Sequence, residues 1–160
     1  PEKALAWANS LDENSSVNKA DALNTVVDTW AYADPEQVIA FAQQTSDPAL
    51  AEKALSIGIF SLSEHQPEKA AAWLNGKEAQ PAFDDAYRNL AMNTRLLRAD
   101  PAKSISLMAA VSDPDVSNEG IISVGEQWYQ FDPSAAEQFF KENTSMSDED
   151  RAELAEYARS

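Results

Sequence analysis

The sequence predicts an all-α fold: a right-handed α-α superhelix, or solenoid, of about five helical hairpins. Three observations predict it. Alanine is abundant and only four glycines occur in 160 residues, a composition that favours helix. Prolines recur at a nearly constant spacing, and most of them follow a residue that can cap a helix. No stretch alternates between apolar and polar residues well enough to predict a β-strand.

Five prolines mark an internal repeat, and they are Pro1, Pro35, Pro67, Pro101 and Pro133. We therefore predict one solenoid domain over residues 1–160, made of repeats 1–34, 35–66, 67–100, 101–132 and 133–160. The intervals between these prolines are alternately longer and shorter. This alternation indicates the duplication of a unit of two repeats, because Pro1-Glu2-Lys3-Ala4 recurs as Pro67-Glu68-Lys69-Ala70.

Helix start signals locate two helices in each repeat. The first helix follows an Asp-Pro pair at Asp34, Asp100 and Asp132, where the aspartate caps the helix and the proline loses no needed donor. The second follows Ser46-Asp47-Pro48, Ser112-Asp113-Pro114 or Ser147-Asp148-Glu149. These signals, with apolar residues at helical spacing, predict helices near residues 2–10, 17–33, 36–44, 48–64, 68–75, 82–98, 102–110, 115–130, 134–142 and 148–158.

Apolar side chains recur at fixed distances from these prolines. Large ones stand six positions after the proline, at Trp7, Phe41, Trp73, Leu107 and Phe139. Others stand five positions before the next proline, at Trp30, Leu62, Leu96 and Trp128. We predict that the first set is largely buried within its own hairpin, since packing accounts for repeated aromatic residues better than an aromatic ligand cage does.

Repeats of about 33 residues, each a helical hairpin with tryptophan in the first helix and proline at the join, resemble tetratricopeptide repeats and the HEAT-like repeats of large bacterial proteins. Where the tetratricopeptide pattern has glycine or alanine four positions after the tryptophan, this chain has Leu11, Thr45, Lys77 and Val111. The resemblance implies a stack of hairpins with an extended concave face that binds peptides or proteins. Because Pro1 lacks a capping aspartate, we expect the chain to be a fragment of a larger bacterial protein.

The net charge of −15 limits the partners. It disfavours nucleic acid and anionic membranes, so we expect a protein or peptide partner, and a charged partner should be basic. The alternative is that the charge serves solubility alone. No apolar run is long enough for membrane insertion. The chain has no cysteine, His65 is its single histidine, and it has no glycine-rich phosphate loop; we therefore expect no metal and no cofactor. Compartment, whether cytoplasmic or periplasmic, and oligomeric state stay open.

A candidate binding surface lies on the predicted first helices. Small side chains stand five positions after the proline and predict a shallow groove, lined by Ala6, Ala40, Ala72 and Ser106. Along one flank of it we expect Lys3, Gln37, Lys69 and Lys103. The alternative is that the alanines pack against the neighbouring hairpin and the lysines are only solvated.

A second candidate lies in the third repeat, whose net charge is zero while the other four carry −3 or −4. Arg88, Arg95 and Arg98 are predicted on one flank of its second helix. The alternative is an ion pair between Arg88 and Asp84, with bridges to the acidic neighbouring repeats. Arg88 stands at a position where other repeats have small residues. A shift of one position in the register of this helix would remove that conflict.

Together these observations predict a non-catalytic scaffold module that binds a protein or peptide. The first alternative is a structural spacer that holds other domains apart. The second is an all-helical enzyme that uses carboxylates, since 27 acidic residues must place some pairs close together.

Overall fold

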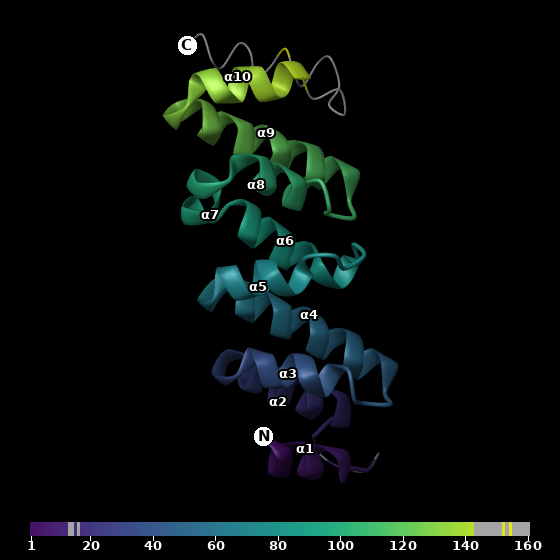
Figure 1. Cartoon of the computed structure of the whole chain (residues 1–160). Coiled ribbons are helices and arrows are strands. Elements are labelled where there is room, and N and C mark those ends of the chain that lie inside the picture. Colours follow the sequence, from purple (N-terminus) through teal and green to yellow (C-terminus); the bar gives the residue numbers. More distant parts are fainter. Residues whose placement is uncertain (13–14, 16, 143–151, 153, 155–160) are drawn as a thin grey trace. The chain divides into compact units, whose positions relative to one another are not determined.

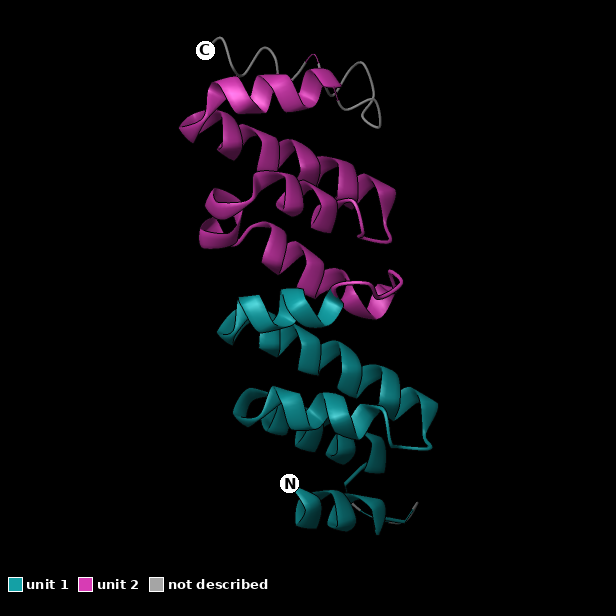
Figure 2. Ribbon diagram, in the orientation of Figure 1, with its two compact units in different colours: residues 1–74 teal, residues 75–160 magenta. Residues whose placement is uncertain are grey.

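The computed structural model describes residues 1–12, 15, 17–142, 152 and 154 (Figure 1). The chain forms two compact units, unit 1 (Pro1–Leu74) and unit 2 (Asn75–Ser160) (Figure 2). All regular structure in the described residues is helical, which confirms the predicted all-α class. The boundary between the units falls inside the third predicted repeat.

Unit 1 contains helices α1 (Glu2–Asn9), α2 (Lys19–Ala33), α3 (Pro35–Ala42), α4 (Pro48–His65) and α5 (Pro67–Leu74). Its principal contacts join each helix to the next helix or the next but one along the chain. The core is rich in alanine, which lets the helices approach closely: it includes Ala8, Ala22, Ala31, Ala42 and Ala54 beside Leu23, Val27 and Val38.

Unit 2 contains η1 (Pro81–Phe83), α6 (Asp84–Ala91), α7 (Thr94–Ala99), α8 (Pro101–Met108), α9 (Pro114–Phe131) and α10 (Pro133–Glu142). Its principal contacts follow the same local pattern, with α8 between α6 and α9 in the order of packing. Most of the helix predicted at 148–158 lies outside the described residues, although Leu154 is described and fully buried. Eight of the other nine predicted helices agree with the structure to within about two residues.

The helix predicted over 82–98 is wrong: it is divided into η1, α6 and α7. Helix α6 ends at Ala91. The Asn93 side chain then accepts hydrogen bonds from the backbone N–H groups of Arg95 and Leu96, at 3.2 Å each. Asparagine favours such local bonds over a helix interior, so it caps α7 instead of continuing α6. Because of this interruption, positions in α6 counted back from Pro101 are shifted by one residue relative to the other repeats. Tyr87 is therefore buried and Arg88 is exposed.

Successive hairpins are joined by a single residue. At Asp34 the backbone N–H closes α2 by donating to the Trp30 carbonyl (2.8 Å), and the carboxylate opens α3 by accepting from the Gln37 N–H (3.1 Å). The backbone angles of Asp34 are φ −151° and ψ 81°. The other joints have similar angles, and they are Gln66, Asp100 and Asp132. All four joints therefore consist of one residue with a similar backbone conformation.

The predicted burial of the residues six positions after the proline is wrong for Trp7, whereas Phe41, Trp73 and Phe139 are partly buried and Leu107 is buried. Trp7 is 51% exposed. The position that is buried in every case is one residue later: Ala8, Ala42, Leu74, Met108 and Phe140. Residues four apart lie on the same face of a helix, so in four of the five repeats the residue three positions after the proline is buried as well, namely Val38, Ala70, Ser104 and Ala136. The residue six positions after the proline lies beside this face.

Because α3 and α4 approach closely at Gly58, we predict that stability depends on the absence of a side chain there. A Cβ atom added there would lie 2.9 Å from Ile39 Cγ1, closer than packed side chains allow. We expect Gly58→Ala to lower the free energy of unfolding, measured by urea denaturation. In an Ile39→Ala background the clash is absent, so the same change should be neutral or stabilising by up to about 1 kcal/mol, since alanine favours helix over glycine. Equal losses in both backgrounds would contradict the proposed contact.

Ser104 in α8 carries a buried hydroxyl with no hydrogen-bond partner among the described residues, and its side chain is 1% exposed. Alanine is buried at the corresponding positions Ala70 and Ala136. We expect Ser104→Ala to raise the free energy of unfolding by about 1 kcal/mol, because it removes an unpaired polar group from the interior. Ser106→Ala is the control, since the Ser106 hydroxyl is exposed and bonded to the Ala102 carbonyl. A loss of stability in Ser104→Ala would show that its hydroxyl is paired.

Candidate binding site

The one-residue joints bring together side chains that stand on either side of each joint in the sequence. Across the Asp34 joint, the rings of Trp30 and Phe41 lie 5.5 Å apart between centroids. Across the Asp132 joint, Trp128 and Phe139 lie 5.0 Å apart. The interplanar angles are 48° and 45°, so both aromatic pairs have the same tilted arrangement. The joint geometry thus places a pair of large side chains beside each of these turns.

At the Gln66 joint the corresponding residues are Leu62 and Trp73, and here unit 1 contains a hollow of about 470 Å³. It is lined by α3, α4 and α5 through Glu36, Ile39, Leu62, Lys69, Ala72 and Trp73. Ile39 and Leu62 are buried, whereas Trp73 is half-buried and Ala72 is exposed. The hollow therefore has apolar walls that solvent can reach.

One ion pair crosses the rim of the hollow. The ammonium group of Lys69 in α5 donates to the carboxylate of Glu36 in α3, and the two side chains are 60% and 54% exposed. An exposed pair of this kind contributes little to stability. Its effect on the hollow is to set a cation and an anion beside an apolar surface.

The hollow lies beside a joint that has leucine where another joint has tryptophan. Leu62 and Trp128 occupy equivalent places, since each stands five positions before the proline that follows its joint. Trp128 is 6% exposed and its indole packs on both Phe139 and Phe140. The equivalent residue Leu62 has a smaller side chain; it is buried and lines the hollow together with Trp73.

Of the residues predicted to line a groove, two line the hollow. All eight of its residues are exposed, namely Lys3, Ala6, Gln37, Ala40, Lys69, Ala72, Lys103 and Ser106. Lys69 and Ala72 line the hollow, but Lys103 and Ser106 belong to α8 in unit 2. The Gln37 amide donates to the Asp34 carboxylate (2.6 Å), so it serves the start of α3. The sequence reasoning missed four lining residues: Glu36, Ile39, Leu62 and Trp73.

The three arginines do not lie on one flank of one helix. The break at Asn93 places Arg88 in α6, and Arg95 and Arg98 in α7. Arg88 pairs with Asp85 (3.5 Å), whereas the alternative drawn from the sequence was a pair with Asp84. The Arg98 guanidinium lies over the ring of Phe131, 5.4 Å from its centroid.

Asp84 instead holds the turn before α9. Its carboxylate accepts hydrogen bonds from the backbone N–H and the hydroxyl of Ser112, at 3.0 and 3.1 Å. Burial, with a smaller contribution from the Asp84 charge, raises the pKa of the Tyr87 phenol. These contacts give the polar groups near Arg88 intramolecular roles in unit 2.

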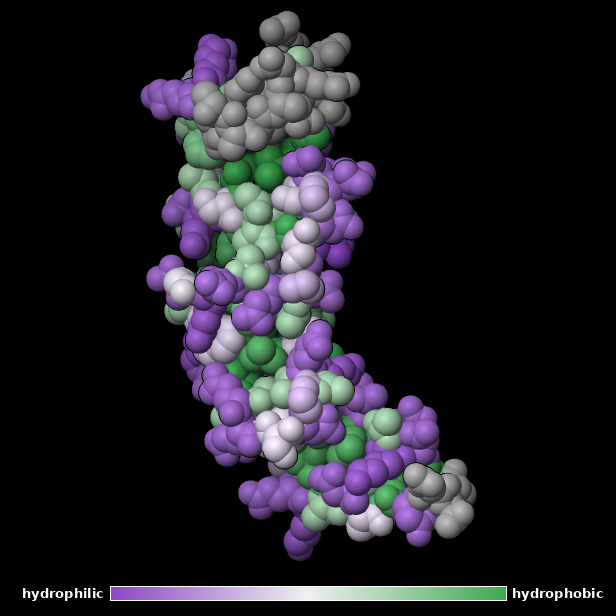
Figure 3. Space-filling view, turned by 90° about the vertical axis from the view of Figure 1, so that its right-hand side faces the viewer, coloured by the Kyte–Doolittle hydropathy of each residue, from purple (hydrophilic) through white to green (hydrophobic). Residues whose placement is uncertain are grey.

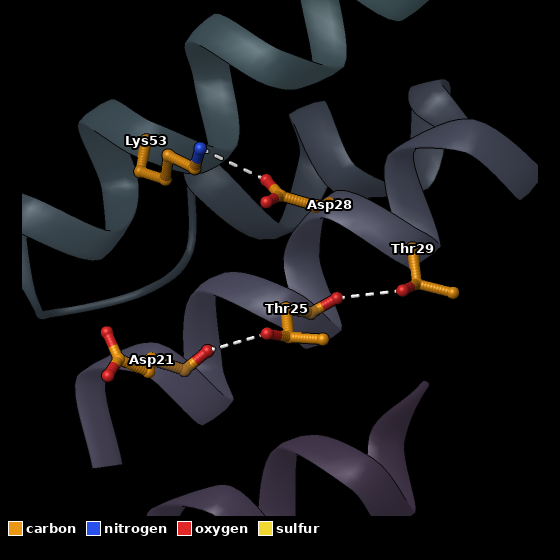
Figure 4. A network of polar contacts seen from close by, with 5 residues as sticks. All are labelled: Asp21, Thr25, Asp28, Thr29 and Lys53. Atoms are coloured by element: carbon orange, nitrogen blue, oxygen red, sulfur yellow. Dashed lines mark hydrogen bonds and ion pairs between the residues drawn. The ribbon is translucent and has the colours of Figure 1, made fainter. Parts of the chain in front are cut away.

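Three polar side chains of α2 have partners within the chain. The hydroxyls of Thr25 and Thr29 each donate to a carbonyl one turn earlier, at 2.8 Å, and Lys53 of α4 pairs with Asp28 at 3.1 Å (Figure 4). On the face shown in Figure 3, hydrophobic residues lie in separate patches between hydrophilic ones. Thr25, Thr29 and Asp28 of α2 therefore have partners within unit 1.

The described residues contain no group of three or more side chains placed to hold a metal ion. None of their helices is long and apolar enough to cross a membrane. Comparisons with protein-family models, curated proteins and solved structures find no match to this chain. The geometry of the hollow is therefore the basis for assigning a function.

Proposed function

We propose that this chain is a non-catalytic binding module that takes a peptide segment of a partner protein. The hollow beside Trp73 is the proposed anchor site. The proposal includes the right-handed stack of helical hairpins, of tetratricopeptide-like or HEAT-like kind, that the repeated prolines predict. The shared geometry of the four joints and the local order of helix contacts within each unit support that stack.

The observation that carries the proposal is an apolar, solvent-accessible hollow with charges at its rim. Its volume of about 470 Å³ lies in the range of ligand-binding pockets. Burial of an apolar side chain against Ile39, Leu62 and Trp73 supplies the main favourable free energy of such a contact. The rim pair of Lys69 and Glu36 can exchange partners with charged groups on either side of that anchor.

Selection from a random peptide library displayed on phage tests this function. Clones selected on the wild-type chain are then measured against Ala72→Arg, which puts a large side chain in the exposed wall of the hollow. We expect at least about tenfold weaker binding, because the anchor can no longer enter. Ala6→Arg is the matched control, since Ala6 is an exposed alanine at the same distance from its proline and does not line the hollow.

Selected clones should therefore bind the wild-type chain and Ala6→Arg alike. If no clone is enriched, or if all enriched clones bind Ala72→Arg as tightly as the wild-type chain, the proposed site is wrong.

A further inference from the structure

We infer that the exposed face of α1, which carries Ala4 and Trp7, is an interface for an amphipathic helix of a partner protein, and that this helix presents a tryptophan or a leucine. The inference goes beyond the proposed function, because α1 does not line the hollow. It has two supports: the burial of the equivalent face in the other repeats, and the side chains with which the chain covers that face.

The first helices of the other four repeats bury the face that α1 exposes. Three positions after the proline, the side chain is at most 1% exposed at Val38, Ala70, Ser104 and Ala136. Six positions after it, the side chain is buried or partly buried at Phe41, Trp73, Leu107 and Phe139. In α1 the corresponding residues Ala4 and Trp7 are both exposed, Trp7 to 51%. Residues three apart share one side of a helix, so the two form a single open face.

The helix that precedes a joint covers this face. Within unit 1 the principal contacts of α5 are with α4, which precedes it, and Ala70 is fully buried. The principal contacts of α1 are with α2, which follows it, and Ala4 is exposed. Figure 2 shows α1 at one end of unit 1. Among the described residues, no helix takes the place on α1 that α4 takes on α5.

The sequence of α1 matches that of the covered helix α5. Pro1-Glu2-Lys3-Ala4 recurs as Pro67-Glu68-Lys69-Ala70, and Trp7 corresponds to Trp73. Both helices therefore offer a neighbouring helix the same small side chain and the same indole. The small side chain matters because helix axes approach as closely as the side chains between them allow.

The covering helices of this chain specify the kind of partner. Across two joints the indole of the preceding helix lies against a phenylalanine ring, with centroids 5.5 Å apart for Trp30 and Phe41 and 5.0 Å apart for Trp128 and Phe139. Five positions before the proline, the preceding helix has tryptophan or leucine in every case, at Trp30, Leu62, Leu96 and Trp128. A partner helix with either residue in its apolar row can pack on Trp7 in the same way. Burial of an exposed indole is a large favourable contribution to such an interface.

A segment of the chain itself is the probe for this interface. The probe is a capped peptide with the sequence of residues 47–66, which is α4 with its capping aspartate and the joint residue Gln66. Binding to the whole chain is followed by the indole N–H signals of the ¹⁵N-labelled protein in two-dimensional NMR, with the Trp7 signal assigned by its loss in Trp7→Phe. We expect the peptide to shift the Trp7 signal with saturation. The peptide with Leu62→Glu should bind at least about fivefold more weakly, because a carboxylate then faces the indole.

Two variants of the whole chain locate the contact. Ala4→Arg places a large side chain in the face and should abolish the saturable shift of Trp7. Ala6→Arg is the matched control and should retain it, because the residue five positions after the proline is exposed in all five repeats. Ala72→Arg, which blocks the hollow, should also retain it, so a failure of the proposed function leaves this result unchanged.

The same segment joined through Gln66 to Pro1 tests the face at high effective concentration, since a free peptide of this length is only partly helical. We expect the Trp7 signal of this fusion to be shifted, and Ala4→Arg to reverse that shift. The inference is overturned if neither the free peptide nor the joined segment shifts Trp7, or if Ala4→Arg leaves the shift intact. A Trp7 signal that moves on dilution of the chain alone would show that a second copy occupies the face, and the partner helix would then be wrong.

Discussion

Between α2 and α3, Asp34 ends one helix with its backbone N–H and begins the next with its carboxylate, and the proline that follows fixes the entry of the new helix. Asp100 and Asp132 repeat this arrangement with nearly the same backbone angles. Because a joint of one residue leaves almost no conformational freedom, it determines which side chains of the two helices meet. The core positions and the paired residues beside each joint follow from that constraint.

The hollow is a consequence of the same constraint. A rigid joint brings the residue five positions before the proline against the residue six positions after it, whatever their sizes. Trp30 and Trp128 each pack against a phenylalanine ring across their joints, whereas Leu62 and Trp73 both line the hollow at theirs. A more flexible connection would let α5 close over the gap, since cavities in a core are costly and tend to collapse where the surrounding structure can move. A stiff joint is therefore compatible with a hollow that stays open between α3, α4 and α5.

Much of the helical structure could be read from the sequence because its determinants are local. Capping aspartates and prolines mark helix ends by hydrogen bonding within a few residues. The break at Asn93 was missed because the apolar spacing continues through it, and only the capping preference of asparagine signals it. The exposure of Trp7 was missed because the large side chains stand beside the fully buried row, which lies one residue later in each repeat. Lys69 and Ala72 were found as site residues, but Glu36, the partner of Lys69, belongs to the preceding repeat, and no local pattern links the two.

A double-mutant cycle on Trp30 and Phe41 tests most directly whether the joint brings these side chains into contact. Each is replaced by leucine, singly and together, and the free energy of unfolding of the four proteins is measured by urea denaturation. A direct aromatic contact predicts a coupling free energy of about 0.5–1.5 kcal/mol. Strictly additive losses, with no coupling between the two positions, would contradict the account.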